Sequence, residues 1–175
     1  MDLRSKIRNV QDFPKEGIGF KDITTVLKDG QAWKFCIDDI KNNLEKDNIE
    51  FDLVVGPEAR GFLVGAPLAY ATETGFIPVR KPGKLPAETV KFEYDLEYGT
   101  DVLEMHKDAI YEGARVVIAD DLLATGGTVE AVVNMIESLG GEVVALCFMI
   151  ELDFLKAREK FAKYPIYSLV HYDGE

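Results

Sequence analysis

Residues 116–128 read Val-Val-Ile-Ala-Asp-Asp-Leu-Leu-Ala-Thr-Gly-Gly-Thr, and this stretch decides the fold. The mostly apolar run 114–119 shows no alternation, which is typical of a strand covered on both faces. Two acids and a loop of small residues follow, and residues 127–139 then repeat apolar side chains at helical spacing. A strand, a short loop and a helix in this order indicate one unit of an α/β fold.

The same alternation extends through most of the chain. Further buried strands are expected at 52–56, 76–79, 143–150 and 166–170, and helices at 3–12, 31–46, 62–73 and 153–163. Residues 87–105 form two extended segments around Tyr98-Gly99, as a hairpin or a mobile flap. The pattern predicts a single α/β domain over residues 1–175, with a central, mostly parallel sheet flanked by helices.

Composition narrows the function classes. A chain of 175 residues suits one domain, and its formal net charge of −11 disfavours nucleic acid as a partner. No apolar run approaches the roughly 20 residues of a membrane helix, and the first residues lack the apolar core of a secretory signal. We therefore expect a cytoplasmic protein without a membrane partner. Cys36 and Cys147 lie in apolar contexts and are interpreted as reduced core residues.

The loop after the two acids has the chemistry of a phosphate site. Ala124, Thr125, Gly126, Gly127 and Thr128 place backbone N–H groups and two hydroxyls at the start of a helix, where the helix dipole favours an anion. Glycine lets the backbone approach the ligand closely.

The acids make sense if the ligand also carries a diol. Asp120 and Asp121 can accept hydrogen bonds from ribose hydroxyls or orient a hydrated magnesium ion. A Walker A loop would need a lysine before the final threonine, and a dinucleotide fingerprint would need G-x-G-x-x-G after a strand; neither is present. A chance strand–turn–helix is the remaining alternative, which the full thirteen-residue context disfavours.

These thirteen residues resemble, at every position, the PRPP (phosphoribosyl pyrophosphate) motif of the type I phosphoribosyltransferases. Other stretches are similar to the members of that family that act on adenine, and the resemblance runs from residue 12 to about residue 155. The supporting stretches are Asp12-Phe13-Pro14, Gly17-Ile18-Gly19-Phe20-Lys21-Asp22-Ile23, Arg60-Gly61-Phe62, Arg80-Lys81-Pro82-Gly83-Lys84-Leu85-Pro86 and Leu96-Glu97-Tyr98-Gly99.

The resemblance implies a base-binding hood within residues 1–30. Phe20 would stack on the adenine, Gly19 and Lys21 would contact the base edge through their backbone, and Leu122 would close the other face. Simple core packing is the alternative role for Phe20.

It also implies a pyrophosphate site and a flexible catalytic loop over residues 81–100. Arg60 and Lys84 would contact pyrophosphate, and a cis peptide is expected at Glu58–Ala59. Arg80 and Lys81 either contact the ligand or form a solvated basic turn.

The loop would also carry Glu97 as acid/base and Tyr98 as a shield against water. The alternatives are a surface helix start for Arg60 and an exposed hairpin tip for the Glu97-Tyr98 pair.

The function implied is purine salvage: adenine and PRPP would give AMP and pyrophosphate. Mg²⁺ would be held mainly by PRPP rather than directly by protein ligands, and the protein would form a homodimer, as is common in the family. Two alternatives remain open at this point. One is transfer to another base, such as xanthine, hypoxanthine or orotate, and the other is a regulator that senses PRPP or purines without catalysis.

Overall fold

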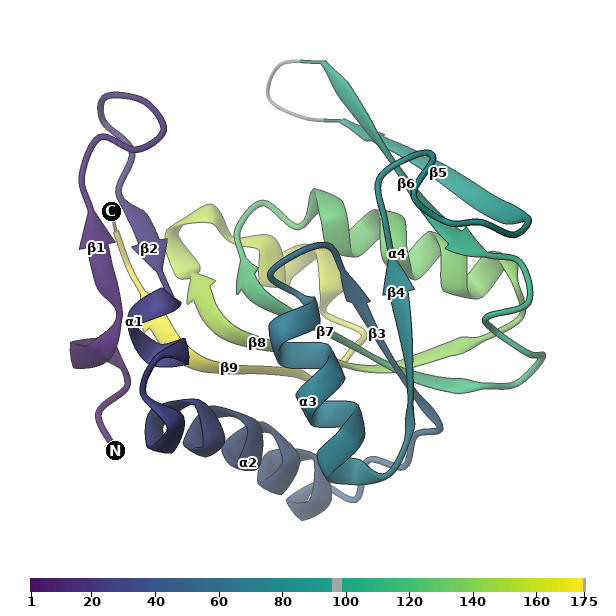
Figure 1. Ribbon diagram of the computed structural model, residues 1–175, viewed down its shortest axis with the longest axis horizontal. Helices are drawn as coiled ribbons and strands as arrows, with labels where there is room; N and C mark the ends of the chain where they lie inside the picture. The colour runs from purple at the N-terminus through teal and green to yellow at the C-terminus, as the bar shows by residue number, and fades with distance from the viewer. Residues whose placement is uncertain (96–98, 175) are drawn as a thin grey trace.

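The computed structural model describes residues 1–95 and 99–174. Five parallel strands form the central sheet in the order β4-β3-β7-β8-β9 (Figure 1). Their bounds are Leu53–Pro57 for β3, Gly75–Val79 for β4, Arg115–Leu123 for β7, Glu142–Leu152 for β8 and Ile166–Tyr172 for β9. The predicted α/β fold with a parallel sheet is therefore confirmed.

Helices cover both faces of this sheet (Figure 1). Helices α2 (Gly30–Lys46) and α3 (Phe62–Thr72) pack on one face, and α4 (Gly127–Ser138) packs on the other. The short helix α1 (Thr24–Leu27) leads into α2, which begins where Asp29 Oδ1 accepts hydrogen bonds from the backbone N–H groups of Gln31 and Ala32. None of the helices within the described residues has both the length and the apolar character needed to cross a bilayer.

The central strand β7 contributes to both layers of the core. Val117 and Ala119 pack on the side of α2 and α3, whereas Val116 and Ile118 pack on the side of α4. Successive residues of a strand point to opposite faces, and helices cover both faces here, so all four side chains are fully buried. This explains why the run 114–119 shows no alternation of polar and apolar residues in the sequence.

The expected hairpin after β4 is present. Strands β5 (Thr89–Asp95) and β6 (Thr100–His106) pair antiparallel and extend above α4 (Figure 1). Its base is joined to the end of β4 because Arg80 and Glu104 exchange backbone hydrogen bonds of 2.9 and 2.7 Å.

The prediction of a helix at 3–12 was wrong. Residues Arg4–Lys6 form one turn of 3₁₀ helix (η1), and Arg8–Val10 then form strand β1, which pairs antiparallel with β2 (Phe20–Asp22). Leu3 and Ile7, which flank this turn on either side, are both buried. An ion pair between Arg8 and Asp22 closes the hairpin.

The prediction of a polar helix at 153–163 was also wrong. Two 3₁₀ turns replace it, η2 (Asp153–Leu155) and η3 (Ala157–Phe161). Between them Lys156 adopts a left-handed conformation with φ of +54°, which a continuous helix does not allow. The break directs Ala157 and Phe161 toward the core.

Candidate active site

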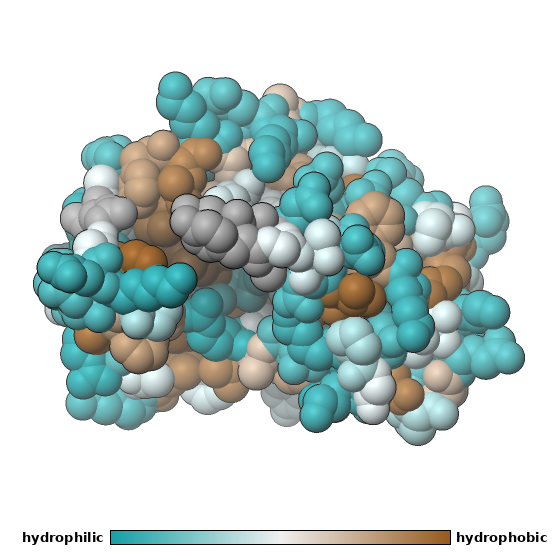
Figure 2. Space-filling view, turned by 90° about the horizontal axis from the view of Figure 1, so that it is seen from above, coloured by the Kyte–Doolittle hydropathy of each residue, from teal (hydrophilic) through white to brown (hydrophobic). Residues whose placement is uncertain are grey.

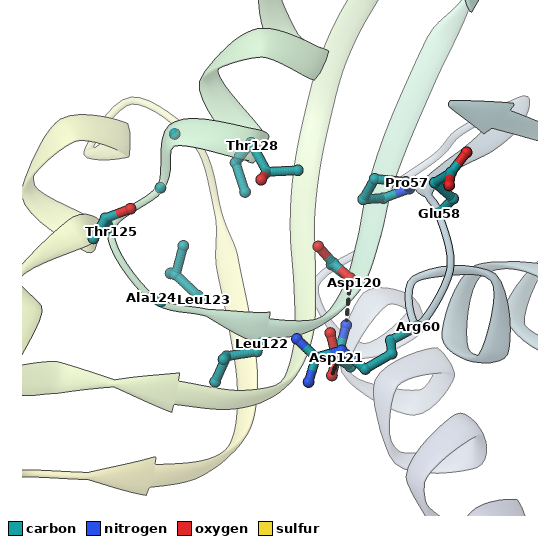
Figure 3. A pocket seen from close by; sticks show the side chains of 13 residues that line it. Pro57, Glu58, Arg60, Asp120, Asp121, Leu122, Leu123, Ala124, Thr125 and Thr128 are labelled. Atoms are coloured by element: carbon teal, nitrogen blue, oxygen red, sulfur yellow. Dashed lines mark hydrogen bonds and ion pairs between the residues drawn. The ribbon is translucent and has the colours of Figure 1, made fainter. Parts of the chain in front are cut away.

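A cavity of about 220 Å³ lies where β3 and β7 end and α4 begins (Figure 3). In open α/β sheets this carboxyl edge is where ligands bind. All the residues predicted for ribose and 5-phosphate line it, together with Arg60 and Leu122. The full lining is Pro57, Glu58, Arg60, Asp120, Asp121, Leu122, Leu123, Ala124, Thr125, Gly126, Gly127, Thr128 and Val129. Figure 2, which looks onto the molecule from the side of the two hairpins, shows this face hollowed, with apolar side chains in part of the floor.

The loop 124–128 is shaped for an anion. Helix α4 starts at Gly127, and Gly126 occupies the position before it with φ of +87°. Gly126 has no side chain that would cap the helix, so the first backbone N–H groups are open to a ligand, at the positive end of the helix dipole. The Thr125 and Thr128 side chains lie at the two ends of the turn in Figure 3.

The two acids form a tightly coupled pair on the opposite wall. The Asp121 backbone N–H donates to Asp120 Oδ1 over 2.8 Å, as the dashed line in Figure 3 shows. Asp121 is 3% exposed, and its Oδ2 lies 3.2 Å from Arg60 Nε. That oxygen accepts no hydrogen bond with good geometry from the described residues. A buried carboxylate oxygen left in this state is an open position for a donor or a hydrated cation.

Burial shifts the pKa values of both carboxyl groups. It raises the pKa of Asp120 well above its ordinary value, and the neighbouring charge of Asp121 raises it further. Burial also raises the pKa of Asp121, although the Arg60 guanidinium opposes the change. Perturbed carboxyl groups inside a cavity are typical of a functional site.

Arg60 connects this cavity to the N-terminal hairpin. Its guanidinium carbon lies 5.1 Å from the centre of the Phe20 ring, and the Phe13 ring meets Phe20 edge to face at 5.2 Å. The structure therefore brings the predicted base-stacking residue next to the predicted pyrophosphate residue. Gly19 and Lys21 flank Phe20 at the start of β2. Lys21 is 5% exposed, and its Nζ donates to Asn9 Oδ1 over 3.0 Å.

The peptide Glu58–Ala59 is cis, as expected from the sequence. The Glu58 side chain organises the rim: Oε1 accepts from the Lys81 backbone N–H over 2.8 Å and from Arg80 Nε over 3.2 Å. Sequence reasoning gave Glu58 no role of its own. Its place beside Arg60, with a basic turn later in the chain, was the available signal.

Gly61 follows Arg60 directly, and its lack of a side chain matters for the cavity. A Cβ there would lie 2.4 Å from the Pro57 carbonyl oxygen and 2.9 Å from Asp120 Oδ1. Only glycine therefore lets Arg60 follow the end of β3 this closely to the acid pair.

The remaining predicted site residues lie elsewhere. Lys84 is exposed in the loop between Arg80 and β5 and does not line the cavity. Lys81 forms an ion pair with Asp101 on β6. Glu97 and Tyr98, the predicted acid/base and water shield, fall outside the described residues.

Comparison with known proteins agrees with this geometry. The phosphoribosyl transferase domain family model matches residues 24–170, so the chain belongs to the phosphoribosyltransferase class. Within that class it belongs to the adenine phosphoribosyltransferase family. It is 63% identical over 173 residues to the adenine phosphoribosyltransferase of Clostridium tetani, with 99% of each chain covered.

Two solved structures are similar over nearly their whole length. Adenine phosphoribosyltransferase from Thermoanaerobacter pseudethanolicus is 57% identical, with a TM-score of 0.94 and 98% of both chains covered. The Saccharomyces cerevisiae enzyme, complexed with adenine and an imino-altritol bisphosphate, is 40% identical, with a TM-score of 0.91 and 96% of both chains covered.

Proposed function

We propose that this chain transfers the 5-phosphoribosyl group of PRPP to adenine, forming AMP and pyrophosphate in purine salvage. The observation that carries this proposal is the junction of β7 and α4, where two acids and an uncapped helix start share one cavity. A ligand with both a phosphate and a sugar diol matches that pair of features. Membership of the adenine phosphoribosyltransferase family supports adenine as the acceptor.

The loop 124–128 holds the 5-phosphate through backbone N–H groups and the two threonine hydroxyls. Asp120 and Asp121 accept hydrogen bonds from the ribose hydroxyls, and their charge favours the cationic character that develops at ribose C1. In the reaction the bond from C1 to the pyrophosphate oxygen breaks, and its electron pair leaves with pyrophosphate. The N9 lone pair of adenine forms the new bond, and the base loses one proton.

Glu97 is the group we assign to that proton, and Tyr98 to keeping water from C1. Adenine stacks on Phe20, with Leu122 on its other face and the backbone of Gly19 and Lys21 at its edge. We further propose that residues 1–30 act as the hood over the base and that residues 81–100 close over the reacting atoms.

Arg60 contacts the leaving pyrophosphate, since a guanidinium offers several donors in a fixed plane. Lys84 joins it once the loop that carries it closes. Magnesium fits this donor set, because the buried Asp121 Oδ2 and the Asp120 carboxylate are hard oxygen ligands for its water shell. When bound, the ion neutralises charge on the pyrophosphate. PRPP would hold most of the metal's coordination, and the two aspartates would orient its waters. We also propose a cytoplasmic homodimer.

The direct test is product formation. The purified protein is incubated with PRPP, Mg²⁺ and adenine, hypoxanthine, guanine or xanthine in parallel. AMP from adenine alone, lost in the Asp120→Asn/Asp121→Asn double variant, is the expected result. Product mainly from another base would overturn the adenine assignment. Binding of PRPP with no product from any base would overturn catalysis and favour a sensor.

A further inference from the structure

The underside of the phosphate loop rests on the segment that follows β8. A Cβ placed on Gly126 would lie 2.7 Å from Phe161 Cε2 and 3.5 Å from the Ala157 Cβ. Both supporting residues are buried, at 4% and 3% exposure. In Figure 3 the yellow-green turns after β8 pass beside Thr125. The position of the loop therefore depends on where η3 holds this ring.

The supporting segment has little stability of its own. Its two 3₁₀ turns, η2 and η3, span three and five residues and are separated by the left-handed Lys156. Turns this short have poor hydrogen-bond geometry and do not persist without tertiary contacts. An anchor from outside the segment must therefore fix Phe161 beneath Gly126.

That anchor is Glu151 on β8, and Arg158 in η3 links the segment to it. Arg158 Nε donates to Glu151 Oε1 over 2.9 Å and its Nη2 to Glu151 Oε2 over 2.6 Å, which is a two-pronged ion pair. Nη1 reaches the Ile166 carbonyl oxygen at 3.3 Å. The Ser168 hydroxyl donates to the same Glu151 Oε2 over 2.6 Å, so β9 also holds the carboxylate. Glu151 is 3% exposed and fixed on the sheet.

The register of the sheet places this anchor beside the site. Glu151 on β8 pairs with Leu123, the last residue of β7 and the one before the phosphate loop. These contacts connect the start and the middle of the phosphate loop. Leu123 pairs with Glu151, which forms the ion pair with Arg158. Arg158 and Phe161 both belong to η3, and Phe161 lies against Gly126. The loop is held at its start by the sheet and at its middle by the ring.

Glu151, Asp153 and His171 also lie close enough to suggest a cation site, with ligand atoms within 4.8 Å of one another. Arg158 argues against that role, because its guanidinium already occupies both oxygens of Glu151. A second positive charge there would be repelled. The cluster is better explained by the support it gives to the loop.

We propose that Arg158 is a positioning residue for 5-phosphate binding, acting through Glu151 and Phe161 on the loop 124–128. This inference rests on the proposed function of that loop. Loosening the support displaces the backbone N–H groups that hold the phosphate, while the pyrophosphate side of the cavity, at Arg60, is unaffected. The defect is therefore selective for one end of PRPP.

The test measures ribose 5-phosphate and pyrophosphate binding separately by calorimetry on folded protein. Arg158→Lys keeps the charge but loses the two-pronged geometry, and Phe161→Leu keeps the ion pair but shrinks the ring. Both are expected to weaken ribose 5-phosphate binding roughly tenfold, by analogy with the loss seen when the outer partner of a metal ligand is removed, with pyrophosphate affinity unchanged. In assays the KM for PRPP rises more than kcat falls.

Arg115→Lys is the matched control. Arg115 forms the same kind of two-pronged pair with Asp52, at the opposite end of β7. The Arg115→Lys variant should leave ribose 5-phosphate binding unchanged. Wild-type-like binding in folded Arg158→Lys overturns the proposal, whatever Phe161→Leu does. Equal weakening of both ligands, or weakening in Arg115→Lys too, also overturns it as a general loss of stability. Failure of the wild-type protein to bind ribose 5-phosphate overturns the proposed function of the loop instead.

Discussion

Arg60 lies over the face of Phe20, with its guanidinium carbon 5.1 Å from the ring centre, while its Nε stays 3.2 Å from Asp121 Oδ2. Arg60, which follows β3, therefore lies between a carboxylate of β7 and an aromatic ring of the N-terminal hairpin. The roles proposed for them, adenine stacking for Phe20 and pyrophosphate binding for Arg60, thus fall on two neighbouring side chains, and each role can be tested alone.

Phe20→Leu should raise the KM for adenine. The smaller side chain keeps an apolar contact but loses ring stacking, which contributes about 0.5–1.5 kcal/mol, so a rise of about three- to tenfold is expected with the KM for PRPP unchanged. Steady-state kinetics with each substrate varied in turn provides the measurement. The control is Phe51→Leu, because Phe51 is a partly buried phenylalanine that packs against the core. An unchanged KM for adenine in Phe20→Leu would show that Phe20 has only a packing role.

Arg60→Lys should lower kcat strongly. Lysine keeps the charge but presents a single donor group to the pyrophosphate, and removal of one positioned donor costs roughly a hundredfold or more in rate. Single-turnover measurements of AMP formation separate this step from binding. Arg4→Lys serves as control, because Arg4 also lies over an aromatic ring, Tyr172 at 4.7 Å. Near-normal turnover in Arg60→Lys would exclude Arg60 from the leaving-group site.

Gly126→Ala should damage both stability and phosphate binding. A left-handed alanine costs about 1–2 kcal/mol, and its Cβ would in addition lie 2.7 Å from Phe161. Gly113→Ala is the control, since Gly113 has φ of +80° but open space around it. Thermal unfolding and ribose 5-phosphate binding of the two variants are compared. Equal losses in both would mean that the contact with Phe161 has no effect on the loop.

Asp120→Asn should stabilise the protein at neutral pH while removing activity. The pKa of Asp120 is raised in the folded state, first by burial and then by Asp121. The folded protein therefore holds the proton more tightly than the unfolded chain, and stability falls as pH rises between the two pKa values. Replacing the ionisable group should therefore raise the free energy of unfolding at pH 7, and the gain should vanish below the unfolded pKa.

Asp52→Asn is the counterpart with the opposite sign. Hydrogen bonds from Arg115 lower the pKa of Asp52 to about 2, so this carboxylate stabilises the fold above its unfolded pKa, and the contribution is lost as pH falls toward 2. Urea unfolding of both variants across pH 3–7 compares the two slopes. A destabilised Asp120→Asn at pH 7 would contradict the raised pKa.

The sequence was most informative where local chemistry and fold agree. The continuous apolar run before Asp120 predicted a doubly covered strand, and the small residues after Leu123 predicted the loop. Both are found, because neither depends on distant contacts. The family resemblance then predicted site roles for Arg60 and Phe20, whose contact joins residues forty positions apart in the chain and has no local signature.

The errors lie where tertiary contacts override local preference. Leu3 and Ile7 have helical spacing, yet backbone pairing between β1 and β2 is the arrangement that forms. Residues 153–163 contain good helix formers, but the left-handed Lys156 divides them so that Phe161 reaches Gly126. The role of Glu58 in holding Arg80 was likewise missed, because the two residues meet only when β3 and β4 pair.

Strand β7 lies in the middle of the sheet, bonded on both sides by β3 and β8, and it carries the acid pair. Native-state hydrogen exchange should therefore rank its amides among the slowest of the molecule, while β1–β2 and β5–β6, each a sheet of two strands, should exchange through small local openings. The residues proposed to bind the sugar would then stay in place while the two hairpins, proposed to cover the base and the reacting atoms, open and close. Substrate entry would need no melting of the layers beneath.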